Sequence, residues 1–493
     1  MGELVPLPPI MVNPGDVFRH SASALIRTLP LMAPLMHKAD VRLHHWFVPM
    51  RLIWTDFEKF ITGGPNGNDA TVHPYIDLPN SGSGGVAVGS LAHYFGIPSG
   101  NNSDNSGYRV SALPFRAYAT IFNEFYRDQD LTTALTVNLG NGADTTTSTA
   151  LQRIMWEKDY FTSARPTPQL GSDVTIALGA QAPVTGIGVA NNTAAAATLT
   201  TGFDTKGSAG SISAWRSDSQ VNYIKAQSNA VAGAGNLPQI YADLSAATGI
   251  SVIALRTALA LQRFRERRMK YGNRYEDLLA SMGVNPRDSR LQLPEYLGGG
   301  KTPLQISEVL QTANGGATAS DLGVGNLRGH GIGATRSNAY RRVFEEHGIV
   351  LTLFSVRPKT AYLQSLHKSW TYTTKEDYWQ PEREHIGQQT VLNREVKANH
   401  ATPNGTFGYQ DRYEEYRVLE DKAVGEFAST LNYWHMAQDY GSDPALNGSF
   451  VQCLPTTRVY AVTNQTVDNL QVFVQQNIQA RRLLAKSGST FTF

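Results

Sequence analysis

The chain has 493 residues, of which 41% are hydrophobic and only 17% are charged, and its formal net charge at pH 7 is +2. This balance excludes a strongly basic nucleic-acid-binding protein, and the single cysteine, Cys453, excludes an intrachain disulfide. No apolar run is long enough for a membrane-spanning helix, so no membrane insertion is expected. The 44 glycines and 24 prolines indicate many turns and long loops, which are typical of a β-rich chain.

The first predicted elements are a strand and a short helical turn. Residues 41–48 alternate between the two faces of a strand, and Pro49 ends it. His45 shares the apolar face of this strand, where a buried, hydrogen-bonded histidine is the ordinary expectation. Residues 55–61 predict a helical turn with Asp56 near its N-terminus, where the helix dipole favours a negative charge.

A loop-rich stretch and a helix follow. Residues 62–110 are rich in Gly, Asn and Ser, and they predict mostly loop. Residues 112–128 predict a helix, because Phe115, Tyr118 and Phe122 fall on one apolar stripe of a helical wheel.

The middle of the chain changes in composition. From residue 182 to residue 236 it consists mainly of Ala, Gly, Ser, Thr and Asn, with few charges. Because disorder usually needs high net charge as well as low hydrophobicity, we expect a β-structured surface insertion here. Residues 251–271 then predict the clearest helix of the chain, with Leu255, Leu259 and Phe264 on its buried side.

Two further β elements are predicted toward the C-terminus. Residues 346–356 predict a strand that is apolar on both faces, as expected when other layers cover it from both sides. Residues 458–463 and 466–475 predict a hairpin, with a turn at residues 464–465 between its two strands.

Glycine-rich motifs and histidines give no chemical signature. The run Gly298–Thr302 imitates the end of a phosphate-binding loop, but Glu295 stands where that motif requires its first glycine. The spacing in residues 323–333 does not match a dinucleotide-binding loop, so a mobile loop is expected there. The twelve histidines show no metal-ligand spacing, and no catalytic set is apparent. We therefore predict neither an enzyme nor a cofactor, and a bound metal ion stays open.

Two basic clusters are the candidates for contact with DNA. The first lies at the end of the helix predicted over residues 251–271. Arginine near a helix C-terminus is favoured by the helix dipole in any protein, so a purely structural role stays open. The second lies in the C-terminal tail, and flexible basic tails can reach phosphates without reading bases. The candidates are Arg263, Arg265, Arg267, Arg268 and Lys270 in the helix, and Arg481, Arg482 and Lys486 in the tail.

The segment from Phe407 to Tyr440 carries eight aromatic residues, with charges between most of them. It does not keep the apolar stripe of a core helix. Subunit interfaces favour Tyr and Trp set among charges, but an aromatic-rich loop folded back on its own domain explains the pattern equally well. The candidate interface residues are Trp54, Phe57, Phe60, Phe407, Tyr409, Tyr413, Tyr416, Tyr433 and Trp434.

Several short segments follow one another in a recognisable order. They include Asn13-Pro14-Gly15-Asp16, residues 47–54 (FVPMRLIW), residues 159–164 (DYFTSA), residues 288–299 (DSRLQLPEYLGG) and the aromatic segment described above. In this order they resemble the major capsid protein of microviruses, which are small phages with circular single-stranded DNA. The resemblance is strongest to the gokushovirus-type branch, and it spans most of the chain, from about residue 11 to residue 440.

The resemblance implies a fold and a function. The implied fold is mainly β: a single eight-stranded antiparallel jelly-roll barrel over residues 1–493, with long insertion loops that carry several helices. Residues 182–236 would then form a surface-exposed insertion within that one domain. The implied function is structural, since copies of the chain would self-assemble into a small T=1 icosahedral shell around a circular single-stranded DNA genome. Outer loops would contribute to host attachment.

The resemblance also implies partners and a location. The partners are further copies of the chain, packaged single-stranded DNA, a small basic DNA-binding protein, a pilot protein and a host cell-surface receptor. The location is the virion, after assembly in the host cytoplasm, and the lone cysteine fits a reducing compartment. A rival hypothesis is a β-rich carbohydrate-binding protein or glycosidase, because jelly rolls host such activities and aromatics stack on sugars. The lack of a signal peptide and of a persuasive acid pair counts against it.

Overall fold

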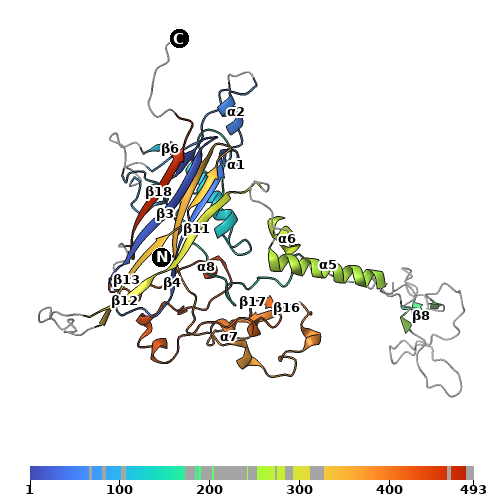
Figure 1. Cartoon of the computed structure of the whole chain (residues 1–493). Coiled ribbons are helices and arrows are strands. Elements are labelled where there is room, and N and C mark those ends of the chain that lie inside the picture. The colour runs from blue at the N-terminus through green and yellow to red at the C-terminus, as the bar shows by residue number, and fades with distance from the viewer. Residues whose placement is uncertain are drawn as a thin grey trace, which may run out of the picture. The chain divides into compact units, whose positions relative to one another are not determined.

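The structure is a computed structural model of the chain (Figure 1). It describes residues 1–65, 69–79, 85–100, 107–171, 252–272, 275–283, 292–310, 327–462 and 468–484, with short strands at 184–185, 187–189, 202–204 and 241–242. The chain forms two compact units. The larger unit consists of Met1–Pro168 with Arg268–Phe493, and the smaller unit of Gln169–Arg267.

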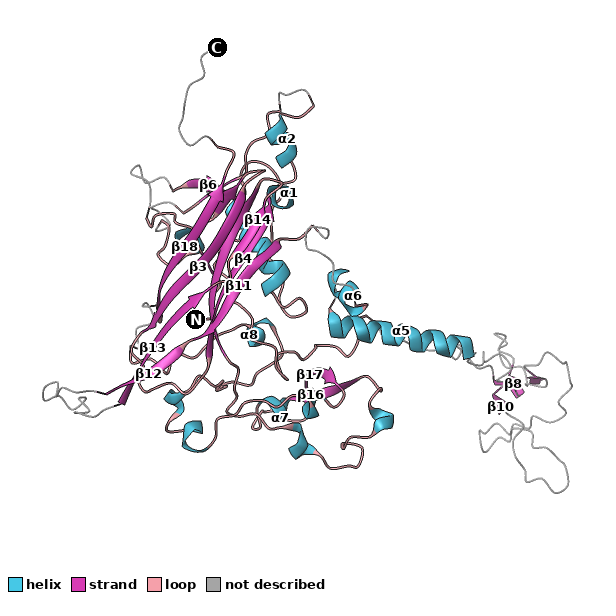
Figure 2. Cartoon of the chain, viewed as in Figure 1, coloured by secondary structure: helices cyan, strands magenta, loops and turns pink. Residues whose placement is uncertain are grey.

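Two five-stranded antiparallel sheets dominate the larger unit (Figure 2). The first sheet contains β1 (Val5–Pro6), β2 (Ile10–Val12), β4 (Ala39–Pro49), β11 (Glu295–Pro303) and β15 (Gly348–Pro358). The second sheet contains β3 (Val17–Thr28), β12 (Gln305–Leu310), β13 (Leu327–Arg336), β14 (Tyr340–Val343) and β18 (Leu470–Arg481). This architecture confirms the prediction of a mainly β, antiparallel fold.

The two sheets pack face to face through apolar side chains. Ile26 of β3 belongs to the same buried cluster as Leu43 of β4 and Phe354 of β15. The chain passes directly from one sheet to the other at Leu304, because β11 ends at the residue before it and β12 begins at the residue after it. The side chain of Leu304 is buried in the same cluster, so it holds the two sheets together at this edge.

The first sheet is buried on both of its faces. On β15, Val350 and Phe354 point toward the second sheet, whereas Leu351 and Leu353 point to the opposite side. Those two leucines pack in the cluster that contains helix α4 (Leu113–Ile121), which covers this face of the sheet. Burial on both faces explains why the strand is a continuous apolar run, and it confirms the strand predicted over residues 346–356.

The second sheet is buried on one face only. Along β3, Phe18, Ala22, Ala24 and Ile26 are buried, while Leu25 on the other face is 45% exposed. The partner strand β18 pairs with β3 over its whole length and is nowhere fully buried. The outer face of this sheet is therefore open to solvent.

The region that follows β15 forms a smaller lobe, and we call residues 360–440 the C-terminal lobe. Its sheet is a hairpin of β16 (Gln388–Leu392) and β17 (Thr406–Asp411), with the short helix α7 (Asn393–Val396) between the two strands. Its apolar core joins lobe residues to Tyr160, Phe161 and Ala164, so the segment before the smaller unit contributes to the lobe as well.

The remaining elements are short, apart from one long helix. In the larger unit they are α1 (Met50–Ile53), α2 (Phe57–Thr62), β5 (Tyr75–Asp77), α3 (Leu91–Tyr94), β6 (Arg109–Ser111), η2 (Phe122–Tyr126), α6 (Tyr275–Ser281), η5 (Lys368–Thr371), η6 (Pro381–Arg383), η7 (Glu414–Tyr416), η8 (Gly425–Ala428), η9 (Asn432–Trp434) and α8 (Gly448–Val451). The smaller unit contains β7 (Val184–Thr185), β8 (Ile187–Val189), β9 (Gly202–Asp204) and β10 (Tyr241–Ala242). The helix α5 (Val252–Tyr271) extends across the boundary between the units in sequence.

Several local predictions are confirmed. The strand over residues 41–48 is β4, and the helix over residues 112–128 is α4 continued by η2. His45 is fully buried and hydrogen-bonds Thr352 Oγ1 at 2.9 Å and Ser337 Oγ at 2.8 Å, as expected for a core histidine.

Other local predictions are wrong. The hairpin over residues 458–475 is absent among the described residues, because residues 458–462 form no strand and β18 pairs with β3 instead. The glycine-rich stretch expected to be a loop is strand from Leu327 onward. Its glycines are needed for close packing: a Cβ on Gly329 would lie 2.3 Å from the carbonyl oxygen of Ala33. Most of residues 182–236 lie outside the described residues, so the predicted insertion remains a prediction.

The long helix α5 has the predicted length but not the predicted buried side. Leu255, Leu259 and Phe264 are 41%, 55% and 38% exposed. An apolar helix stripe normally marks a face that packs on a core. In the part of the chain that the structure describes, the side chains of this stripe are largely exposed to solvent.

Candidate subunit and nucleic-acid interfaces

Three of the predicted interface aromatics lie inside the chain. Trp54 is fully buried, and its indole Nε1 donates a hydrogen bond to Asn141 Oδ1. Phe407 is 6% exposed and lies in the core of the C-terminal lobe. Tyr413 is 3% exposed and adopts a left-handed backbone conformation with φ of +64°. These three side chains stabilise the subunit itself, and as placed they offer almost no surface to a neighbour.

The other six predicted aromatics keep accessible surface. Phe60 is 39% exposed and Tyr416 is 56% exposed. Phe60 lies beside the buried Trp54, with 4.8 Å between their ring centroids, so it covers Trp54 on the solvent side. The half-buried members of the set are Phe57, Tyr409, Tyr433 and Trp434. All six remain predictions as interface anchors.

Glu415 in the aromatic segment and Glu395 on the helix α7 before it form hydrogen bonds inside the lobe. Glu415 accepts hydrogen bonds from Tyr372 Oη at 2.7 Å and from Gln389 Nε2 at 2.5 Å. Glu395 is fully buried and accepts a hydrogen bond from Tyr160 Oη at 3.0 Å. Burial raises the pKa of Glu395 above its ordinary value, although Lys368 opposes the shift. The segment is thus in part a loop folded on its own domain, which was the alternative left open by the sequence.

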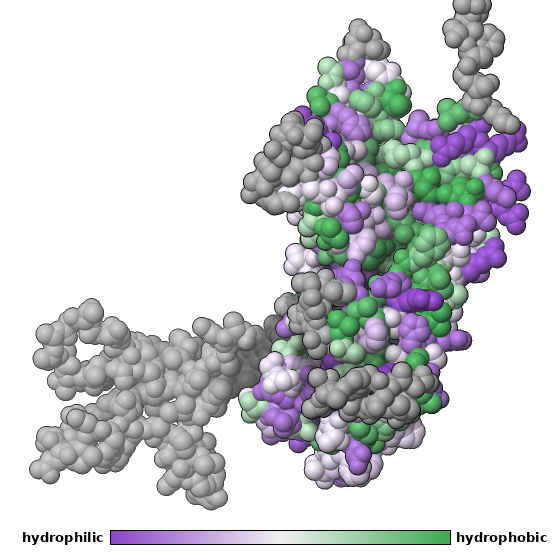
Figure 3. Space-filling view, turned by 90° about the vertical axis from the view of Figure 1, so that its left-hand side faces the viewer, coloured by the Kyte–Doolittle hydropathy of each residue, from purple (hydrophilic) through white to green (hydrophobic). Residues whose placement is uncertain are grey.

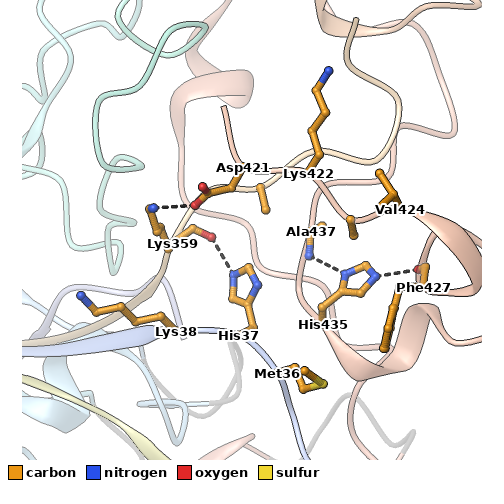
Figure 4. A pocket seen from close by; sticks show the side chains of 12 residues that line it. Met36, His37, Lys38, Lys359, Asp421, Lys422, Val424, Phe427, His435 and Ala437 are labelled. Atoms are coloured by element: carbon orange, nitrogen blue, oxygen red, sulfur yellow. Dashed lines mark hydrogen bonds and ion pairs between the residues drawn. The ribbon is translucent and has the colours of Figure 1, made fainter. Parts of the chain in front are cut away.

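An apolar pocket that the sequence did not indicate opens on this lobe (Figure 4). Its cavity is about 540 Å³, and it is built from three segments far apart in sequence: residues 36–38, residues 359–361 and residues 421–437. Met36 and Val424, which line it, are 68% and 70% exposed. No local motif unites these segments, so only the folded structure brings them together.

The polar groups of this pocket are fixed by hydrogen bonds and ion pairs. Lys359 Nζ lies 2.5 Å from Asp421 Oδ2 at its rim. His435 Nδ1 accepts a hydrogen bond from the backbone N–H of Ala437, so its Nε2 must carry the proton that reaches the carbonyl oxygen of Phe427 at 2.7 Å. Burial lowers the pKa of His37, which keeps that imidazole neutral at pH 7. The pocket is therefore an apolar recess whose rim carries Lys38, Lys422 and the Lys359–Asp421 ion pair, and its floor suits an apolar side chain of another molecule.

Further large apolar side chains are exposed elsewhere on the lobe. Trp370 is 79% exposed, Trp379 is 53% exposed and Leu419 is 77% exposed. Figure 3 shows one face of the molecule, on which hydrophobic patches reach the surface between strongly hydrophilic ones. Large exposed apolar side chains concentrated on one region make that region a candidate interaction surface. The sequence carries a signal for it at residues 370–379, where four aromatic residues flank a run of three charged ones.

The basic cluster of α5 is not uniformly available to DNA. Arg263 and Arg267 are exposed, whereas Arg265 and Arg268 are half-buried. Lys270 forms an ion pair with Asp411 on β17, and its carbonyl oxygen accepts a hydrogen bond from Arg165 Nη2 at 2.7 Å. Lys270 is therefore a structural residue that ties the end of the helix to the lobe.

The basic cluster of the tail is divided in a similar way. Arg481 is exposed at the end of β18, so it belongs to a strand and not to a flexible tail. Arg482 donates a hydrogen bond to the carbonyl oxygen of Met11 at 2.9 Å, and its Nε lies 3.6 Å from Asp16 Oδ2. Lys486 lies outside the described residues. Of the two described tail residues, Arg481 is the one with a free side chain.

Comparison with known proteins assigns the chain to a family. The family model of the phage capsid protein (F protein) matches residues 1–490. The chain belongs to the capsid protein (F protein) family. This membership confirms the microvirus resemblance and identifies a structural major capsid protein of the virion. Among the described residues, no helix could cross a membrane, and no three His, Cys, Asp or Glu residues are placed to hold a metal ion.

Three relatives support the same family. The chain is 34% identical to the capsid protein VP1 of Bdellovibrio phage phiMH2K, across 94% of this chain and 88% of that protein. It is 32% identical to the capsid protein VP1 of Chlamydia phage 1, across 94% of this chain and 89% of that protein. It is 31% identical to the capsid protein VP1 of Spiroplasma virus 4, across 92% of this chain and 85% of that protein.

Proposed function

We propose that this F-family capsid protein is the single repeating subunit of a closed T=1 icosahedral shell around circular single-stranded DNA. Family membership over residues 1–490 supports a shell. The observation that carries the proposal is the exposed apolar surface of the C-terminal lobe, including Trp370, Trp379 and the pocket between Met36 and Val424. A monomer would leave this surface in water, whereas contacts between identical subunits would cover it.

The two-sheet sandwich would act as the rigid part of the subunit. We interpret it as a jelly roll, because long antiparallel strands form two sheets that pack face to face and the chain switches sheets at Leu304. We further propose that residues 1–493 form one domain and that residues 182–236 are its surface insertion. The role is structural and not enzymatic. Assembly would occur in the host cytoplasm, and outer loops would meet a host receptor.

The lobe supplies the contacts that would close the shell. Phe60, Tyr416 and the half-buried Phe57, Tyr409, Tyr433 and Trp434 are the proposed anchors from the set predicted by the sequence, and Trp370 and Trp379 join them. Interfaces of this kind gather their binding energy in a few buried aromatic residues. A small basic DNA-binding protein and a pilot protein are proposed as further partners of the shell.

The test is to express the full chain and to measure particle size by light scattering and shape by negative-stain electron microscopy. Uniform closed shells, or oligomers that convert to them, are the expected result. The double variant Trp370→Ser/Trp379→Ser should abolish shells while leaving the circular dichroism spectrum unchanged, since both side chains are exposed in the subunit. A wild-type protein that stays monomeric, or a double variant that assembles normally, would contradict the proposal.

A further inference from the structure

The outer face of the second sheet carries exposed arginines. Because side chains alternate along a strand, Arg19 and Arg27 of β3 point away from the sandwich core. Register places outward residues of the neighbouring strands beside them, and five of these positions in total are exposed arginines: Arg19, Arg27, Arg336, Arg341 and Arg481. We call these five residues the arginine face. In the described strands of this sheet, no outward-pointing position holds Asp or Glu.

Three of these arginines gather at one end of the face. Arg19 lies directly opposite Arg341 in the β3–β14 pair. Arg481 lies opposite Val17 in the β3–β18 pair, which places it diagonally across from Arg19. All three line one open depression of the surface, together with Gln479 and Tyr340. Like charges directly opposite each other destabilise a sheet, so this arrangement adds nothing to the stability of the subunit alone.

Among the described residues, the arginines of the arginine face have no carboxylate partners, whereas the arginines next to them in sequence do. Arg342 is adjacent to Arg341 in sequence but points to the other side, where its Nη2 lies 3.0 Å from Glu295 Oε2. Arg482 follows Arg481 and lies near Asp16. In the part of the chain that the structure describes, none of the five arginines of the face forms an ion pair. Carboxylates therefore neutralise the neighbouring arginines, and the arginine face itself stays positively charged.

The rest of the face offers amide groups and an aromatic ring. The outward positions of β18 include Gln471, Gln475, Asn477 and Gln479, all exposed. Phe473 lies among them and is 69% exposed, directly opposite Leu25 of β3. An exposed aromatic ring on a sheet face that also carries arginines is a stacking platform for unpaired bases. Amide side chains can hydrogen-bond sugars, phosphates or base edges without a charge requirement.

We propose that the arginine face binds single-stranded nucleic acid. Arg19, Arg341 and Arg481 each contact a backbone phosphate of a strand that runs over their shared depression, since guanidinium groups match phosphate geometry. Phe473 stacks on a base further along the same sheet. The contact reads no sequence and weakens as salt rises. This inference deepens the proposed function and rests on it, because it names the surface that an enclosed single-stranded genome touches.

The test compares two triple variants of the full chain with equal loss of charge. The first is Arg19→Gln/Arg341→Gln/Arg481→Gln. The matched control is Arg109→Gln/Arg342→Gln/Arg417→Gln, which removes three exposed arginines that each have a carboxylate partner. Binding of a fluorescein-labelled oligothymidine is followed by fluorescence anisotropy over a series of NaCl concentrations. Circular dichroism and thermal melting establish that each variant is folded.

The expected result separates the two variants. The first triple variant should bind oligothymidine at least tenfold more weakly at low salt. Its slope of log K against log salt should fall by roughly 2, since each phosphate of a single strand that the protein neutralises adds about 0.7 to the slope. The control variant should keep the wild-type slope within error. Equal affinity and slope in both variants would overturn the inference.

Further outcomes identify a different partner or separate the inference from the proposed function. If the face binds a polyglutamate peptide as tightly as oligothymidine, the partner is an acidic protein segment and the nucleic-acid inference is wrong. If the wild type assembles into shells while the first variant retains full DNA binding, the inference fails and the capsid function stands. If the wild type binds DNA through this face but never assembles, the shell proposal fails and the inference stands.

Discussion

The two sheets of the sandwich have opposite surroundings. The first sheet is covered on its outer face by α4 and neighbouring segments, and its strand β15 is buried along almost all its length. The second sheet leaves its outer face in solvent and carries the arginine face there. Both sheets share the same inner core. The shared buried faces hold the fold together, whereas the exposure of the outer face differs between the sheets and indicates the use of each sheet.

The substitution that should reduce stability most is at Arg116, which lies beneath the covered sheet. Arg116 and Asp144 form a fully buried ion pair at 2.8 Å, and Arg116 Nη1 also donates to the carbonyl oxygens of Ile53 and Gly140. Arg116→Met leaves Asp144 without its charged partner, so it should lower the free energy of unfolding by about 3–5 kcal/mol in chemical denaturation. Arg109→Met breaks an exposed pair with Asp77 and should leave the stability unchanged. Equal effects of the two substitutions would contradict the buried placement.

Alanine substitutions at two leucines, one on each sheet, compare the burial of the two sheets directly. Leu351 on β15 is fully buried under the covering helix, so Leu351→Ala should destabilise the protein by about 2–5 kcal/mol. Leu25 on β3 is 45% exposed on the arginine face, so Leu25→Ala should change stability by no more than about 0.5 kcal/mol. Denaturant titration of both variants measures the difference. A large loss for Leu25→Ala would mean that the second sheet is covered within the subunit after all.

The core shared by the sheets should make stability depend on pH. Burial lowers the pKa of His45 from 6.5 to about 3 and that of His20 from 6.5 to about 4. Their rings lie 4.5 Å apart, beside Tyr340. Between the folded and unfolded pKa values the unfolded state binds more protons, so stability should fall as the pH is lowered from about 6.5 toward 4.

The size of this effect can be measured with a substitution. For His45 the expected loss is on the order of 3 kcal/mol at pH 4 relative to neutral pH, from about 1.4 kcal/mol per pH unit. His45→Gln removes one titrating group, and it should flatten the plot of unfolding free energy against pH in this range. A variant with the wild-type slope would show that His45 does not titrate between the sheets.

A substitution at Phe473 on the uncovered sheet should change DNA affinity only moderately and leave stability unaltered. Phe473→Ala should weaken oligothymidine binding by about tenfold, the usual cost of losing one stacking platform. Because Phe473 is 69% exposed, stability should not change. Phe473→Trp should restore the affinity, since a larger ring stacks at least as well. Fluorescence anisotropy measures all three proteins, and unaltered binding by the alanine variant would remove Phe473 from the binding surface.

Features that depend on local pattern were predicted from the sequence. The alternation in residues 41–48 and the double-sided apolar run in residues 346–356 identified the two central strands of the covered sheet. The apolar stripe of residues 112–128 identified its covering helix. These patterns are local because each follows from which faces of one element are buried.

Features that depend on distant segments were not predicted. Arg19, Arg341 and Arg481 are far apart in sequence, and only strand register places them in one depression. The predicted basic candidates form runs along the chain, and among them Lys270 and Arg482 have structural partners. The aromatic segment presents the same difficulty, because composition does not separate the buried Phe407 from the exposed Tyr416.

The most direct test of the contrast between the two sheets is ultraviolet crosslinking of DNA-filled particles, followed by mass spectrometry of the nucleotide-bearing peptides. We predict crosslinks on β18, at or beside Phe473, and on β3 between Arg19 and Arg27. We predict none on the helix α4 that covers the first sheet. Crosslinks confined to other parts of the chain, with β3 and β18 unmodified, would contradict the proposed contrast.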